Sequence, residues 1–82
     1  MTAVGKAELQ AWVVEAIEVW GGSAALIDVC RVIWRDHETD LRDSGDLFYT
    51  WQYDVRWAAT GLRKRGLLHA ADVSPRGLWE LT

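Results

Sequence analysis

The sequence predicts an α+β fold that is mainly helical, with three helices followed by a C-terminal β-hairpin. Three stretches repeat apolar residues at the spacing of an amphipathic helix. After the third stretch, a basic run and Gly66 are typical of a helix end, and two short apolar segments around a turn follow. We therefore expect helices at about 7–20, 24–37 and 48–65 and a hairpin at about 67–82.

The first predicted helix has one apolar face. Its apolar residues recur at i, i+3, i+4, i+7, i+8 and i+11, and they are Leu9, Trp12, Val13, Ala16, Ile17 and Trp20. Gly21-Gly22 is expected to end this helix, because glycine commonly follows the last turn. The preceding residues, 1–6, are expected to be disordered.

The second predicted helix is more apolar than the first. Ser23 is placed to cap it, and one stripe carries Leu26, Val29, Cys30, Ile33 and His37, which Ile27 and Trp34 widen. Such a helix is expected to be buried on two sides. Residues 22–24 before it are the only candidate for a third strand beside the hairpin. Residues 38–47 after it are rich in Asp, Ser and Gly, which predicts a loop.

The third predicted helix separates an apolar face from a polar face. The apolar face consists of Trp51, Val55, Ala58, Ala59 and Leu62, and the polar face consists of Tyr49, Gln52, Tyr53, Arg56, Thr60 and Arg63. Asp46 or Ser44 can cap a helix that begins near Leu47, whereas Thr50 can cap one that begins at Trp51. Both starts fit the pattern.

The residues after this helix predict a wing. Leu67–Ala70 and Leu78–Leu81 are expected to be strands, with a turn at Ser74-Pro75-Arg76-Gly77 between them. Helix, glycine, strand, basic turn and strand form the second half of a winged helix-turn-helix. In that fold the helix, here residues 50–65, can enter the major groove of DNA. The wing, here residues 73–77, can reach the backbone or the minor groove.

The same stretch resembles the N-terminal winged-helix domain of Mrr-type restriction proteins. The resemblance is carried by Trp57-Ala58, Leu62, Lys64, Gly66-Leu67-Leu68 and Ser74–Thr82, although the spacing within the wing differs slightly. It covers less than half of the chain and implies a winged-helix fold and DNA binding. A PD-(D/E)xK nuclease pattern is missing from the sequence, so the resemblance implies no nuclease activity.

Length and composition predict one small intracellular domain. Half of the 82 residues are apolar and six are Trp, so the chain can bury a core without disulfides. The single Cys excludes an internal disulfide and a cysteine-rich zinc site. The N-terminus shows no signal pattern, and no run approaches the roughly 18 apolar residues of a membrane span. We expect a soluble, cytoplasmic protein.

The charge is distributed unevenly. The net charge is −3, which argues against a protein that simply coats nucleic acid. Residues 1–49 hold four basic and nine acidic residues, whereas residues 50–82 hold five basic and three acidic ones. The positive end therefore coincides with the predicted recognition helix and wing, as DNA binding requires. A solvated helix end is the simpler alternative for the basic run.

Nine residues are predicted to contact double-stranded DNA, namely Tyr49, Gln52, Tyr53, Arg56, Thr60, Arg63, Lys64, Ser74 and Arg76. Gln can pair with adenine and Arg with guanine at the major-groove edge, and Tyr can donate to phosphate or pack on a thymine methyl group. Arg63, Lys64 and Arg76 are expected to contact phosphates. Asp54 would repel phosphate if it faced DNA, and we expect it to lie on the Trp57 side of the helix.

The sequence gives little support for a metal site or for a reactive cysteine. Asp36, His37 and Glu38 are consecutive on a predicted helix and cannot face one metal ion, so we expect no metal and no cofactor. Cys30 is expected in the core. The same holds for Trp12, Trp20, Trp34 and Trp51, whereas Trp57 is expected to pack under the wing and Trp79 to pack the hairpin onto the helices.

A second hypothesis is that the winged helix is used for protein–protein contact without DNA binding, as a homodimer or with an effector protein. The acidic first half and the six Trp residues favour it, because exposed aromatic patches mark interfaces. In either case the sequence predicts a binding module and not an enzyme.

Overall fold

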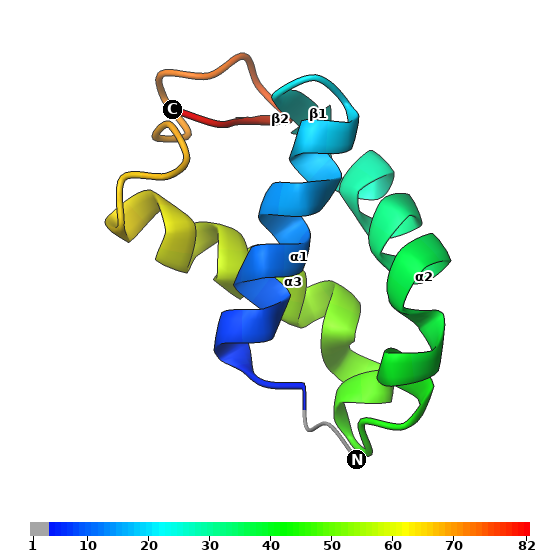
Figure 1. The fold of residues 1–82 in the computed structure, drawn as a ribbon. Coiled ribbons are helices and arrows are strands. Elements are labelled where there is room, and N and C mark those ends of the chain that lie inside the picture. The colour runs from blue at the N-terminus through cyan, green and yellow to red at the C-terminus, as the bar shows by residue number, and fades with distance from the viewer. Residues whose placement is uncertain (1–3) are drawn as a thin grey trace.

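In the computed structural model, three helices pack around one apolar core and a small antiparallel sheet lies at one end (Figure 1). The structure describes residues 4–82. The elements in chain order are α1 (Lys6–Val19), β1 (Ser23–Ala25), α2 (Leu26–Arg42), α3 (Leu47–Lys64) and β2 (Leu78–Glu80). The predicted α+β, mainly helical class is confirmed, and the layout is that of a winged-helix-like domain.

Helix α1 matches its prediction closely. It begins at Lys6, so this residue belongs to the helix and not to the disordered lead that was expected at residues 1–6. Residues 1–3 of that prediction lie outside the described residues. The Gly5 amide donates a hydrogen bond to the Glu8 carboxylate at 3.0 Å, which caps the helix. Gly21 and Gly22 end it with positive φ angles. Their amides donate to carbonyls of the last turn, the pattern of a Schellman motif.

Helix α2 is longer than predicted, and the loop expected at 38–47 is shortened to residues 43–46. The helical φ/ψ angles are interrupted at His37, but the helix resumes and ends at Arg42. Leu41 is fully buried, and Arg42 forms an ion pair with Glu38 at 2.8 Å across one turn. Leu41 is the buried residue of this last turn, and the polar composition around it does not reveal that burial.

Helix α3 begins at Leu47, the earlier of the two predicted starts. Asp46 takes the N-cap position but makes no side-chain capping hydrogen bond. At the other end Gly66 has φ 77°, and the Leu67 amide donates to the Leu62 carbonyl at 2.9 Å. Gly66 therefore ends the helix as predicted, in a left-handed conformation that side chains with a Cβ rarely adopt.

Replacing Gly66 should test this helix end. Gly66→Ala is expected to lower the free energy of unfolding by about 1–2 kcal/mol, because an L-residue pays that cost in the left-handed region. A Cβ at this position would meet no atom within 4 Å, so the effect comes from the backbone alone. Gly66→Asn should cost less, because Asn tolerates this region. Urea denaturation measures both, and equal costs for Ala and Asn would contradict this explanation.

The sheet differs from the prediction in its pairing. β2 pairs mainly with β1, antiparallel, with Ala24 opposite Trp79, so the third strand considered for residues 22–24 exists at Ser23–Ala25. The predicted strand Leu67–Ala70 is wrong in length, because it is reduced to a single bridge between Leu68 and Leu81. The base of the hairpin is still closed, since the His69 amide donates to the Glu80 carbonyl at 2.9 Å.

The segment after the bridge turns instead of extending. The amides of Val73 and Ser74 both donate to the Ala70 carbonyl, which closes a helical turn. Ala and Asp, which fill residues 70–72, are poor strand residues, whereas they are compatible with a turn. The wing is therefore a compact loop on a short hairpin base.

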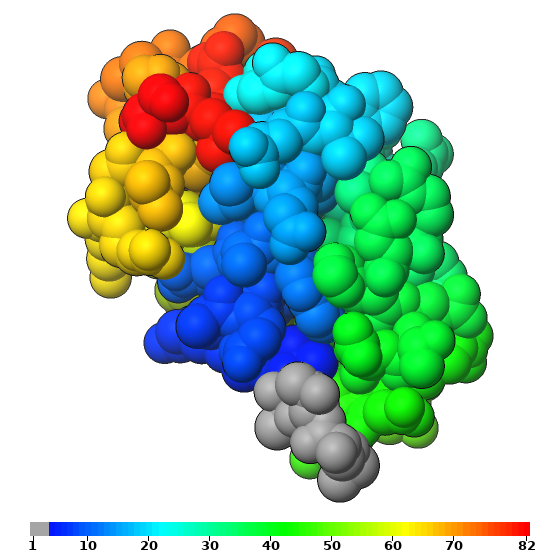
Figure 2. All heavy atoms as spheres, viewed as in Figure 1, coloured from blue at the N-terminus to red at the C-terminus, as the bar shows by residue number. Residues whose placement is uncertain are grey.

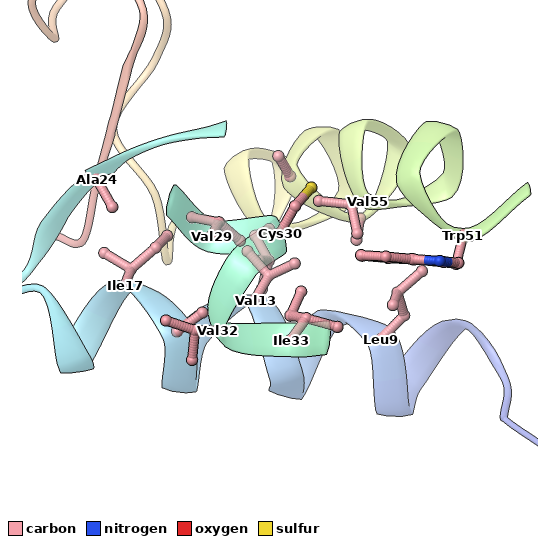
Figure 3. Packing of buried hydrophobic residues seen from close by; sticks show 14 of the residues in the cluster. Leu9, Val13, Ile17, Ala24, Val29, Cys30, Val32, Ile33, Trp51 and Val55 are labelled. Atoms are coloured by element: carbon pink, nitrogen blue, oxygen red, sulfur yellow. The ribbon is translucent and has the colours of Figure 1, made fainter. Parts of the chain in front are cut away.

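The core lies where the three helices meet. α1 contributes Leu9, Val13 and Ile17, and Figure 3 shows Leu9 pointing toward the ring of Trp51 on α3. In the space-filling view, α1 lies between α2 and the C-terminal half of α3 (Figure 2). The buried face predicted for the third helix is confirmed in full: Trp51, Val55, Ala58, Ala59 and Leu62 are all buried.

The burial of the tryptophans differs in part from the prediction. Trp51 is buried and stacks on partly buried Trp34 at a ring separation of 6.0 Å. Partly buried Trp12 packs against the core and stacks on His37 at 3.9 Å. Trp20, predicted in the core, is half exposed, because its indole N–H donates to the Asp28 carbonyl at the edge of α2. Trp57 is exposed and does not lie buried under the wing.

Candidate nucleic-acid interface

The polar face of α3 points away from the core. Tyr49 is 83% exposed and Tyr53 is 61% exposed, and Gln52 and Arg56 are exposed beside them. We call these four side chains the recognition face. They follow from the amphipathic pattern, because the opposite side of the same helix is buried along its length.

A shallow depression of about 390 Å³ lies between the first turns of α2 and the recognition face. Its lining consists of Leu26, Ile27, Cys30, Gln52, Tyr53 and Arg56. The predicted residues Gln52, Tyr53 and Arg56 are thus brought together, next to the helix that precedes the recognition helix. Ile27 and Leu26 were not among the predicted site residues, because their spacing on α2 indicated only a wide apolar stripe.

Cys30 at this depression reports on the local electrostatics. Burial raises the pKa of the Cys30 thiol, and the positive charge of Arg56 opposes part of that rise. The thiol therefore stays protonated at neutral pH. Arg56 and Cys30 both line the depression, so the unpaired positive charge of Arg56 lies at this site.

Ion pairing distinguishes the arginines of α2 from the cations of the second half of the chain. The arginines of α2 pair with carboxylates of the same helix: Arg31 with Asp28, Arg35 with Asp36 and Arg42 with Glu38. The hydrogen bond between Arg35 and Asp36 raises the pKa of that guanidinium and lowers the pKa of that carboxyl.

The cations of the second half have no such partners within residues 4–82. No carboxylate oxygen lies within 4.0 Å of the charged groups of Arg56, Arg63, Lys64, Arg65 or Arg76. Arg63 donates to the His69 carbonyl at 3.3 Å, and Arg65 donates to the Gln10 side-chain oxygen at 2.7 Å. These bonds orient the guanidinium groups without neutralising them, so α3 and the wing keep their positive charge.

The residues of α3 that are predicted to contact phosphate differ in how exposed they are. Lys64 is exposed at the end of α3, whereas Arg63 and Thr60 are only partly exposed. The Thr60 hydroxyl donates back to the Arg56 carbonyl at 3.2 Å, so it is occupied within the helix. Arg63 and its bond to His69 tie α3 to the hairpin, which gives Arg63 a structural role as well.

The wing presents Arg76 and hides Ser74. The Leu78 amide donates to the Pro75 carbonyl at 3.0 Å and Gly77 has φ 82°, which defines a type II turn with exposed Arg76 at its second position. Ser74 is only 8% exposed, and its hydroxyl has no hydrogen-bond partner in the described chain. Ser74, which was predicted to contact DNA, is therefore not presented at the surface of the wing, because the turn at Ala70 folds it inward.

Asp54 lies apart from the depression between α2 and α3. Its carboxylate accepts a hydrogen bond from the Thr50 hydroxyl at 2.8 Å, and it lines a different groove together with Trp57. This is the side of α3 expected from the sequence. Its negative charge consequently does not sit between Gln52 and Arg56.

The described residues show neither a metal site nor a membrane span. Within residues 4–82, no three His, Cys, Asp or Glu side chains gather to hold an ion, and the carboxylate that lies beside the His37 ring nitrogen is that of Asp40, at 3.9 Å. None of the helices in this range is long and apolar enough to cross a membrane.

Trp57 was not among the predicted site residues, although the sequence contains the relevant pattern. Tyr49, Tyr53 and Trp57 are spaced by four residues, so they form one exposed aromatic row along α3. Tyr53 and Trp57 pack edge to face at a ring separation of 6.2 Å. Comparisons of the chain with protein-family models, curated proteins and solved structures found no match, so the fold and this surface are the observations that bear on its function.

Proposed function

We propose that this protein is a non-enzymatic DNA-binding module that docks on double-stranded DNA through α3 and the wing. The observation that carries the proposal is the segregation of charge: the cations of α3 and the wing are unpaired in the described chain, whereas the arginines of α2 are paired. Uncompensated cations attract the phosphate backbone and release its counterions.

The recognition face has the chemistry for contacts with base edges. Gln52 and Arg56 are four residues apart and share one side of α3 at the depression. In a major groove, Gln can bond bidentately to adenine and Arg to guanine, and Tyr53 between them can pack on a thymine methyl group. In this proposal Lys64 and Arg76 contact phosphates on either side and fix the register, and Arg63 supports them from the base of the wing.

The resemblance to Mrr-type proteins suggests the biological setting. We propose a cytoplasmic reader associated with restriction or defence, or else a small transcription regulator. Both roles need a domain that recognises DNA and leaves any chemistry to another domain or partner.

Salt dependence tests the proposal directly. We expect a labelled duplex of about 20 base pairs to bind at low salt, with log affinity falling linearly against log salt. The expected slope is about −3, because three or four cations reach phosphates at about −0.9 per contact. Fluorescence anisotropy measures it. Absence of binding even at about 20 mM salt would contradict DNA binding.

The second candidate function is protein–protein contact, and the exposed aromatic row favours it. Tyr49, Tyr53 and Trp57 expose large rings on an 82-residue domain, and such patches commonly mark protein interfaces. The two functions share Tyr49 and Tyr53, and Tyr53 lines both the depression and the groove that carries Trp57, so a partner seated on the whole row would cover part of the recognition face.

A further inference from the structure

The depression between α2 and α3 has an apolar wall that the proposed base contacts do not use. Leu26, Ile27 and Cys30 form this wall on the first turns of α2. Ile27 is the exposed large hydrophobic residue of α2, and 59% of its surface is open to solvent. One exposed hydrophobic residue alone is ordinary on a protein surface. Ile27, however, shares the depression with Tyr53, which is 61% exposed, so an apolar surface lies directly beside the recognition face.

The charge of the depression favours duplex DNA as its occupant. Arg56 is the charged side chain of the lining, and none of the lining residues within 4–82 is a carboxylate. Asp28 follows Ile27 in the chain, but its carboxylate pairs with Arg31 at 3.5 Å. An apolar surface beside one uncompensated cation matches a molecule that presents apolar groups and phosphates together. Duplex DNA does so along its major groove.

The position of Ile27 beside α3 determines which part of the major groove it can reach. A helix with its side chains is about 10–12 Å across, and the groove is about 12 Å wide, so a recognition helix nearly fills it. Ile27 lies on the α2 side of the depression, whereas Gln52 and Arg56 lie on the α3 side. When these two polar side chains reach base edges, Ile27 therefore meets the border of the groove and not its centre.

Thymine carries an apolar group at that border. Across the major-groove edge of an A·T pair, the order is N7 and the amino group of adenine, then O4 and the C5-methyl group of thymine. The methyl group is outermost on the thymine side, because C5 is one ring atom farther than C4 from the paired base. Thymine is the one standard base of DNA with an apolar substituent on this edge, so a contact with it carries sequence information.

We propose that Ile27 is a specificity-determining residue of the DNA interface, whose side chain packs on the C5-methyl group of a thymine next to the base pair that Arg56 contacts. This inference rests on the proposed DNA binding and adds to it a base contact from α2. Neighbouring base pairs are about 3.4 Å apart, so two side chains at one depression can reach neighbouring pairs. Leu26 packs against the core and Cys30 is 8% exposed, so the wall that carries Ile27 is already formed without DNA. A preformed contact loses little conformational entropy on binding.

Deoxyuridine tests the contact, because it lacks the C5-methyl group of thymidine but keeps its base pairing and its phosphate. The probe is the tightest-binding duplex selected from a random pool of about 20 base pairs, or two helical turns. Each thymine is replaced in turn by deoxyuridine, and fluorescence anisotropy measures the affinity at one fixed salt concentration. Replacement of the contacted thymine should weaken binding about fourfold, the expected effect of one buried methyl group. The other replacements should leave the affinity unchanged.

Variants of Ile27 assign the effect to this side chain. Ile27→Ala should bind the thymine duplex at least about fourfold more weakly, and it should no longer distinguish thymine from deoxyuridine. Ile27→Val keeps a branched apolar side chain and should retain most of the discrimination. Val19→Ala is the matched control, because Val19 is a 56% exposed aliphatic residue on α1 that does not line the depression. It should change neither affinity nor discrimination. Both positions are exposed, so circular dichroism should show folded variants.

The possible results separate this contact from DNA binding itself. If the parent protein binds no duplex even at low salt, the DNA proposal fails and the contact with thymine fails with it. If the protein binds but no single deoxyuridine replacement matters, or if Ile27→Ala keeps the same discrimination, the contact is overturned while DNA binding stands. If Ile27→Ala weakens binding but keeps the full difference between the two duplexes, Ile27 contacts the sugar–phosphate backbone, which also overturns the proposal.

Discussion

Reversing the charge of Arg56 is expected to weaken binding to duplex DNA by at least about 100-fold. A bidentate contact with a base contributes about 1–3 kcal/mol of discrimination, and a carboxylate in its place adds repulsion from the phosphates. Arg56 has no ionic partner in the described chain, so its loss breaks no internal ion pair. Reversal of Arg76 at the wing should weaken binding less, about tenfold, because a backbone contact is one of several. The double variant should show no measurable binding.

A matched control separates local contact from net charge. Arg35→Glu changes the net charge by the same amount, but Arg35 lies on α2 and is neutralised by Asp36. We expect it to change affinity by less than about threefold at physiological ionic strength, because exposed charges more than about 8 Å apart are then largely screened from each other. Circular dichroism should confirm that all variants fold. Binding that survives both Arg56→Glu and Arg76→Glu would show that this face is not the one that docks.

Competition with random and modified duplexes then separates base contacts from phosphate contacts. Loss of a phosphate contact weakens all sequences alike and reduces the salt slope by about one unit. Loss of a base contact instead relaxes the preference at one position. Arg56→Ala should do the second, and Arg76→Ala should do the first.

The parts of the fold set by periodicity could be predicted from the sequence. The buried face of α3, the glycine stops after α1 and α3 and the mainly helical α+β class follow from spacing and from left-handed glycines, which are local properties. The exposure of Tyr49, Gln52, Tyr53 and Arg56 follows from the same periodicity, since a helix with one buried face must present the other.

The parts that depend on distant contacts could not be predicted. Ser74 is buried because the chain turns at Ala70, and Trp20 is exposed because its indole bonds to α2, neither of which the local pattern encodes. The pairing of β1 with β2 joins residues far apart in the chain, and β1 is only three residues long. Trp57 carries a recognisable spacing, but whether that side of α3 meets the wing, α1 or water depends on how α1 crosses it.

The largest effect on stability is expected at Leu41, in the segment that composition assigned to a loop. Leu41 is fully buried in the last turn of α2, so Leu41→Ala should lower the free energy of unfolding by about 2–5 kcal/mol. For a domain of this size that corresponds to a fall in Tm of roughly 10–30 °C. Thermal unfolding followed by circular dichroism at 222 nm measures it.

Ile27→Ala is the matched control for Leu41, because it removes the same number of carbon atoms from the same helix at a position that is 59% exposed. It should change stability by less than about 0.5 kcal/mol. If the two variants melt alike, Leu41 does not hold the last turn to the core, and residues 38–42 behave as the loop that their composition indicates. If only Leu41→Ala lowers the Tm, the burial of this one leucine is what makes a polar segment the helical end of α2. That end sets where the turn to α3 begins, and therefore how the recognition face is oriented.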